Sequence, residues 1–265
     1  TMITMDRSLT EEMFEQSDAT HRVAAHELAH QWFGNLVTCA NFKDAWLNEG
    51  FASFSEAIWG EYLSGKTGYV KSLDGRLSSY VNQIIGSEGA LPLHNFQTVK
   101  GVSNYPTTIY SKGALVLAML RYYLGDEDFF LAIKDYLNKY ANSTATTADL
   151  KSIFEKQSKK NLTDFFNEWV YQAGVPVIDV VSVHTNKKVT VTVKQVQGSE
   201  WGNYTWLPIG LSFISENNET FNTIVTLQNK EQSFSVSVPF IPTSIQVNKH
   251  PEFRALMRVR KSEFE

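Results

Sequence analysis

The sequence has little of several features that mark common protein classes. Cys39 is the single cysteine among 265 residues, so an intramolecular disulfide is excluded and a small buried thiol is expected. The net charge is −4 and no long basic run occurs, which argues against nucleic acid as a partner. No apolar stretch reaches the roughly 18 to 20 residues that span a bilayer, so no membrane partner is expected either.

The first residues also lack the charged and apolar regions of a signal peptide. The sequence therefore leaves the compartment open, and we expect a soluble protein that is cytoplasmic or exported. Hydrophobic residues make up 43% of the chain and aromatic residues 13%, enough for one large core or two moderate ones.

Histidine is scarce too, with six residues, yet two of them lie four positions apart in the segment His26-Glu27-Leu28-Ala29-His30. Residues four apart stack on one face of a helix, so both imidazoles can reach one metal ion. Glu49 would be the third ligand, and two nitrogens with one carboxylate leave Zn²⁺ an open position for water. We therefore predict one catalytic zinc bound by His26, His30 and Glu49, with Glu27 as general base.

The residues around these side chains favour a buried site. The predicted helix that carries His26 and His30 is apolar on nearly all sides, and Glu49 is flanked by Trp46 and Phe51. A buried carboxylate or imidazole is costly without a partner, and a metal supplies one. Glu56 and Asp44 are candidates for orienting a ligand imidazole, with an ordinary solvated acid as the alternative for each.

The segments HELAHQWFGNLVT (residues 26–38), WLNEGFA (46–52), IYSKGA (109–114) and FNEW (166–169) recur in this order in one known family. They resemble the catalytic domain of the aminopeptidase N family of gluzincin metallopeptidases, over most of residues 20–180. The resemblance implies that Tyr110 is the catalytic tyrosine, whose phenol stabilises the oxyanion. The residue pattern alone does not single it out among 11 tyrosines.

Hydrophobic periodicity predicts a helical half followed by a β half. Helices are expected over residues 18–33, 43–63, 69–85, 107–124, 128–140, 147–158 and 162–172, and residues 86–106 as an irregular loop that walls a cleft. Strands are expected over residues 177–183, 188–195, 207–215, 221–227, 233–240 and 244–247. The predicted fold is α+β, with a thermolysin-like helical catalytic domain (residues 1–175) and an antiparallel β-sandwich domain (residues 176–265), an order that the family shares.

The remaining histidines are expected to be structural or solvated, although one of them, in the predicted cleft loop, could contact substrate. These are His21, His94, His184 and His250, with His94 in the loop.

The sequence departs from the family in one respect. The exopeptidase motif G-[AG]-M-E-N, whose glutamate binds the substrate α-amine, is absent, as are the family's amino-terminal β-domain and carboxy-terminal helical domain. We expect a fragment against which those domains of a parent protein pack, and low peptidase activity for the fragment alone.

Three functions fit these observations. The first is a zinc aminopeptidase that acts on peptides, and the second is a thermolysin-like endopeptidase with the same ligand set. The third is a non-catalytic scaffold that keeps the fold. The intact set of ligands favours an enzyme.

Overall fold

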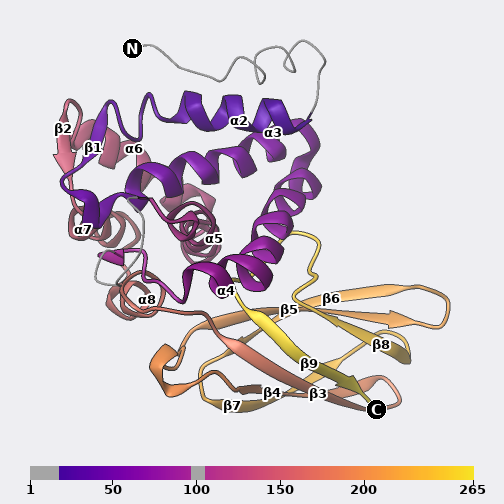
Figure 1. Ribbon diagram of the computed structural model, residues 1–265. Helices are drawn as coiled ribbons and strands as arrows, with labels where there is room; N and C mark the ends of the chain where they lie inside the picture. The colour runs from indigo at the N-terminus through magenta and orange to yellow at the C-terminus, as the bar shows by residue number, and fades with distance from the viewer. Residues whose placement is uncertain (1–17, 97–104) are drawn as a thin grey trace.

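The computed structural model describes residues 18–96 and 105–265. Within them the helices gather in one region and most strands in another, shown as the upper and lower parts of Figure 1. The expected α+β fold class is confirmed. The helical elements are α2 (Asp18–Ala29), η1 (Phe42–Asp44), α3 (Trp46–Ser79), η2 (Tyr80–Ile84), α4 (Ile85–Glu88), α5 (Thr107–Leu124), α6 (Asp126–Lys139), α7 (Thr147–Ser158), α8 (Thr163–Phe166), η4 (Asn167–Tyr171) and η5 (Ser199–Trp201).

Helix α5 forms the centre of the helical region, because its residues 113–120 are all buried. It lies against α3 where Gly50 meets Gly113. A Cβ atom added at Gly113 would lie 2.8 Å from the Gly50 Cα, closer than real Cβ atoms come. The two glycines therefore let the backbones approach. This contact brings the segment that carries Glu49 close to the first turns of α5.

Helix α3 is broken in its middle. Ser64 and Gly65 leave the helical conformation, and the φ of Gly65 is +63°. Beyond the break the chain turns sharply, so that the backbones of Gly60 and Gly68 touch. The predicted end of a helix near residues 64–65 thus corresponds to a real break, but the next helix resumes before the expected residue 69.

Helix α2 is shorter and less buried than expected. It ends at Ala29 rather than residue 33, and His30 lies in the following turn. The helical spacing persists to that residue, because the His30 N–H donates to the His26 carbonyl. The prediction of a buried core helix is wrong for the described residues. Leu28 and Trp32 are 49% and 45% exposed, because α2 lies at the outer side of the helical region (Figure 1).

Other boundaries differ by smaller amounts. Residues 107–124 and 147–158 match α5 and α7 in full, whereas the predicted helix over residues 162–172 is a short α8 followed by the π-helical turn η4. Of the expected cleft loop over residues 86–106, the first residues belong to α4, and residues 97–104 lie outside the described part.

The β region contains two sheets, with strand orders β7-β4-β3-β9 and β6-β5-β8. All of its pairs are antiparallel except β3 with β9, so the four-stranded sheet is mixed. Strand β9 and the small parallel sheet β1-β2 were not expected. The strands are β1 (Val37–Cys39), β2 (Ser143–Ala145), β3 (Val177–Thr185), β4 (Lys188–Gln195), β5 (Leu207–Ser215), β6 (Thr220–Leu227), β7 (Glu231–Ser237), β8 (Pro242–Val247) and β9 (Arg258–Phe264).

Aromatic and charged contacts join the two regions. Trp206 packs against Tyr123, with ring centroids 4.6 Å apart. The guanidinium of Arg254, beyond β8, donates to both carboxylate oxygens of Asp74 on α3. The second half of α3 is therefore fixed to the β region. In residues 18–96 and 105–265, none of the helices combines the length and the hydropathy of a membrane span.

Candidate metal centre

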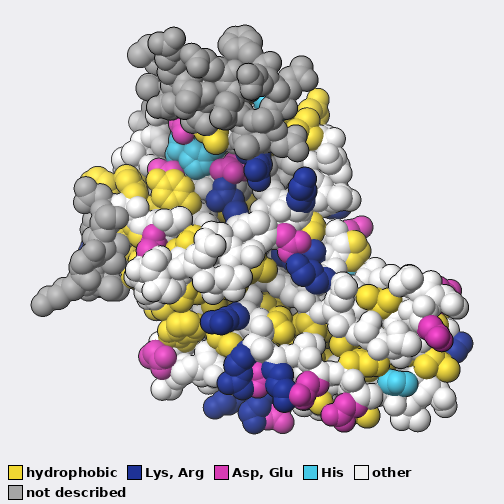
Figure 2. Space-filling model, turned by 45° about the vertical axis from the view of Figure 1, so that its right-hand side comes forward, with side chains coloured by type: hydrophobic (Ala, Val, Ile, Leu, Met, Phe, Trp, Pro, Cys, Tyr) yellow, Lys and Arg dark blue, Asp and Glu magenta, His cyan; other side chains and the backbone are white. Residues whose placement is uncertain are grey.

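Three side chains named by the sequence converge at the outer side of the helical region. His26 comes from α2, His30 from the turn after it, and Glu49 from the first turn of α3. The two Nε2 atoms are 3.2 Å apart, and each is 3.4 Å from Oε2 of Glu49. The side chains of His26, His30 and Glu49 are 12%, 22% and 14% exposed, so the site is shielded from solvent but still accessible. Figure 2 shows histidine and acidic side chains adjacent on this surface.

This triangle fits a tetrahedral metal ion. Zinc bonds of about 2.0 to 2.1 Å place neighbouring ligand atoms about 3.3 to 3.4 Å apart, the edge length of the tetrahedron. The observed separations of 3.2, 3.4 and 3.4 Å match one face of that tetrahedron. The donor set suits Zn²⁺, which accepts imidazole nitrogen and carboxylate oxygen.

The other ring nitrogens determine which atoms face the triangle. Nδ1 of His26 contacts Oε1 of Glu56 at 3.0 Å, and Nδ1 of His30 contacts the Phe33 carbonyl oxygen at 2.9 Å. Both partners are acceptors, so each Nδ1 carries a proton and a neutral ring has its lone pair on Nε2. Two lone pairs 3.2 Å apart repel each other unless a proton or a metal ion lies between them.

Without a metal, protons take that role. Burial lowers the pKa of His26, but its contacts with Glu49 and Glu56 outweigh burial and raise the pKa to about 9. Burial raises the pKa of Glu49, and the two imidazoles outweigh this effect and lower it to about 2. The contact with Glu49 also raises the pKa of His30. A metal ion at this site would therefore compete with protons.

The two further candidate residues lie at the same site. Glu27 follows His26 on α2, and the Tyr110 ring stacks on the His26 ring with centroids 6.1 Å apart. Burial, then the negative charge of Glu49, raises the pKa of Tyr110 to about 12, and Glu27 adds to this effect. The Tyr110 phenol consequently stays protonated near neutral pH and remains a hydrogen-bond donor.

Of the two candidate supporting acids, one contacts a ligand and one does not. Glu56 reaches His26, as described above. Asp44 is buried elsewhere, where it accepts hydrogen bonds from N–H and Oγ1 of Thr147 and ties η1 to α7. His94 lies beside Asp44, with Nε2 and Oδ1 3.7 Å apart. Asp44 is therefore a link between helices.

Two details differ from the sequence-based picture. Cys39 was expected to be buried, but its strand β1 lies at the surface and the residue is partly exposed. Arg76 was not singled out, yet its Nη2 lies 2.5 Å from Oε1 of Glu56. No pattern in the sequence links these two residues, which are twenty positions apart.

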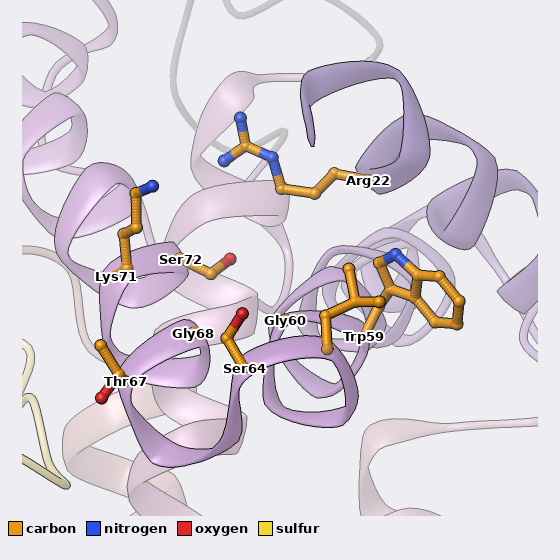
Figure 3. Close-up of a pocket in the computed structure, with 9 residues that line it drawn as sticks. Arg22, Trp59, Gly60, Ser64, Thr67, Gly68, Lys71 and Ser72 are labelled. Atoms are coloured by element: carbon orange, nitrogen blue, oxygen red, sulfur yellow. The ribbon is translucent and has the colours of Figure 1, made fainter. Parts of the chain in front are cut away.

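Two hollows lie beside α2 and α3, and one of them reaches the site. One of about 360 Å³ is lined in part by Glu56, Arg76 and Ser111. The other, of about 270 Å³, lies between α2 and the two halves of α3 (Figure 3) and is lined by Arg22, Trp59, Gly60, Leu63, Ser64, Thr67, Gly68, Lys71 and Ser72.

Comparisons with known proteins identify the family of the chain. The family model described as the peptidase family M1 domain matches residues 1–169. The chain belongs to this family, in line with the resemblance to aminopeptidase N. Aminopeptidase M1-C of Oryza sativa subsp. japonica is 36% identical over 186 residues, which cover 66% of this chain and 20% of that protein. Probable aminopeptidase 2 of Sulfurisphaera tokodaii is 38% identical over 176 residues, covering 62% of this chain and 21% of that protein.

The fold also matches a solved structure. The aminopeptidase A of Legionella pneumophila, solved in complex with aspartic acid, superposes with a TM-score of 0.72 at 20% sequence identity. The match covers 92% of this chain and 28% of that structure. The chain spans about a fifth of the length of the curated relatives named above.

Proposed function

We propose that this chain carries the catalytic centre of a zinc aminopeptidase, which hydrolyses the N-terminal residue from peptides. The observation that carries the proposal is the triangle of His26, His30 and Glu49 atoms, with both histidine Nδ1 atoms held by acceptors. Membership of the M1 family and the aminopeptidase names of its relatives support peptide substrates.

The ligands divide the work between them. His26 and His30 would each supply an Nε2 lone pair, and Glu49 a carboxylate oxygen, which leaves one position open. Zinc bound there supplies Lewis acidity, which activates a water molecule near neutral pH. Glu49, with its lowered pKa, is ionised at neutral pH and so is ready to bind a cation.

The remaining two residues handle protons and charge. The Glu27 carboxylate takes a proton from the attacking water and returns it to the leaving amine. The Tyr110 phenol donates a hydrogen bond to the carbonyl oxygen as that atom gains negative charge. Donors of this kind are worth about 3 kcal/mol of barrier. A phenol is protonated near neutral pH, and burial of Tyr110 favours this form further, as the role requires.

The relatives are about five times longer than the matched segment, so we propose that further domains complete the substrate cleft and that this chain alone turns over slowly.

The test combines metal analysis with a substitution that leaves the ligands intact. We expect one zinc per chain after reconstitution, and unchanged zinc content in Glu27→Gln. Turnover of an aminoacyl anilide, measured at high protein concentration, should fall at least about 100-fold in that variant. Substoichiometric zinc, or equal turnover by Glu27→Gln, would contradict the proposal. Faster cleavage of N-acetylated peptides than of free peptides would assign the site to an endopeptidase instead.

A further inference from the structure

We infer that Arg76 is a positioning residue of the metal centre, acting through Glu56 on the ligand His26. This inference rests on the proposed zinc site. Oε1 of Glu56 lies between two donors, Nδ1 of His26 at 3.0 Å and Nη2 of Arg76 at 2.5 Å. The three side chains retain 12%, 15% and 18% of their exposure, so solvent screens the contacts less than at an open surface.

The break in α3 makes this contact possible. In one continuous helix, residues twenty positions apart would be about 30 Å apart, far beyond the reach of Glu56 and Arg76. The non-helical residues Ser64 and Gly65 turn the chain instead, so the second half of α3 lies beside the first and Arg76 comes within reach of Glu56. Figure 3 shows this turn, with Gly60 and Gly68 on its two sides. A cation from the far half of α3 thus reaches the flank of the metal centre.

Arg76 restricts where the Glu56 carboxylate can lie. Beside both residues is the hollow of about 360 Å³, so a carboxylate held by His26 alone would have room to rotate away. If the Glu56 carboxylate moved away, Nδ1 of His26 would lose its acceptor and the imidazole ring could rotate. The Nε2 lone pair would then no longer have a fixed direction. Groups that hold a ligand imidazole in this way typically change metal affinity by about 10- to 100-fold when they are removed.

A purely structural ion pair between α3 segments is the competing explanation, and a double-mutant cycle on zinc affinity separates the two. The variants are Arg76→Met, Glu56→Ala and the double variant, with the zinc Kd measured by chelator competition. We expect Arg76→Met to weaken binding about tenfold, and Glu56→Ala by at least as much. Because Arg76 acts through Glu56, the double variant should bind zinc as weakly as Glu56→Ala alone.

The spectrum of the cobalt-loaded chain is a second measurement, and it would not change if Arg76 were purely structural. The visible absorption of the Co²⁺-loaded chain reports ligand geometry, and we expect its bands to shift in Arg76→Met. Arg121→Met is the matched control. Arg121 on α5 also pairs with a glutamate of α3, with Nη1 2.5 Å from Oε2 of Glu61, and it is similarly shielded. Its loss should lower the melting temperature and leave both the zinc Kd and the cobalt spectrum unchanged.

The outcomes are distinguishable. The inference is overturned, while the proposed function stands, if Arg76→Met changes neither the zinc affinity nor the cobalt spectrum. It is also overturned if the losses of affinity in the double variant are additive. If the unaltered chain binds no zinc, the proposed function and this inference both fail. Arg76→Gln serves as a second neutral variant should the methionine variant not fold, with the same expected loss of affinity.

Discussion

The contact between Gly50 and Gly113 predicts opposite effects for two glycine-to-alanine substitutions. At Gly113 an added Cβ would lie 2.8 Å from the Gly50 Cα, whereas at Gly75, in the second half of α3, nothing lies within 4 Å of it. Both glycines are within helices, and neither has a positive φ. Gly75→Ala is therefore a matched control that differs mainly in the steric contact.

The magnitude follows from the missing space. Two carbon atoms rest about 3.5 to 4.0 Å apart, so Gly113→Ala must push α5 from α3 by roughly 0.7 to 1.2 Å or strain the contact. Overpacking of this kind costs about 1 to 3 kcal/mol. The two atoms nearest to the added Cβ belong to the backbone of Gly50, which moves less easily than the end of a side chain. Alanine is favoured over glycine in a helix by about 1 kcal/mol at either position. The helix preference cancels in the comparison, so the two variants should differ by about 1 to 3 kcal/mol.

Urea unfolding of the metal-free chain measures this difference. We expect Gly75→Ala to match or exceed the stability of the unaltered chain by up to about 1 kcal/mol, and Gly113→Ala to fall below it. In thermal unfolding the gap should be about 2 to 12 °C, at roughly 2 to 4 °C per kcal/mol for a chain of this size. Equal stability of the two variants would show that α3 and α5 do not approach as described.

Three further predictions concern pH, metal and capping. Without metal, the raised pKa of His26 (about 9, against 6.5) contributes stability below pH 6.5, and this stability is lost as the pH rises through 9. The lowered pKa of Glu49 (about 2, against 4.5) contributes stability above pH 4.5, and this stability is lost as the pH falls through 2. Melting temperatures in chelator should thus be highest between about pH 4.5 and 6.5, and a maximum above pH 8 would contradict these shifts. Free zinc at 100 times its Kd should add about 2.7 kcal/mol, seen as a higher melting temperature that chelator reverses; no shift would argue against a native-state site. Glu88→Ala should cost about 1 kcal/mol in urea unfolding, because its carboxylate accepts from the N–H groups of Thr107 and Thr108 at the start of α5; a stability equal to that of the unaltered chain would mean that water replaces this cap.

The elements that the sequence predicted best have strong local causes. Helix α7 begins with a capping box, in which Thr146 and Asp149 satisfy each other's backbone N–H groups, and its predicted bounds match the structure. Helix α5 follows Pro106 and ends at Gly125, which has a positive φ, so both of its ends are encoded within one or two residues. Strand β4 alternates between buried and more exposed residues, β5 is a nearly continuous buried run, and the bounds of both also match.

The elements that the sequence missed depend on distant partners. Strand β9 carries mostly charged and polar residues with little alternation, and it becomes a strand because β3 offers its free edge. Strands β1 and β2 have three residues each, too few for a period to appear. Helix α2 ends early because residues 31–37 form successive turns of their own, with Val37 N–H bonded to the Trp32 carbonyl.

The same distinction separates the proposed metal ligands from the residues that support them. The predicted ligands lie within 24 residues of sequence, and the two histidines have helical spacing, so a local rule finds them. Their orientation depends on Glu56, which is held by Arg76 from beyond the break in α3, and on the approach of α5, which two distant glycines permit. The identity of the proposed ligands is thus encoded locally, whereas their orientation depends on how the helices assemble. Substitutions at Gly113 or Arg76 should therefore perturb the site even though neither residue touches the metal position.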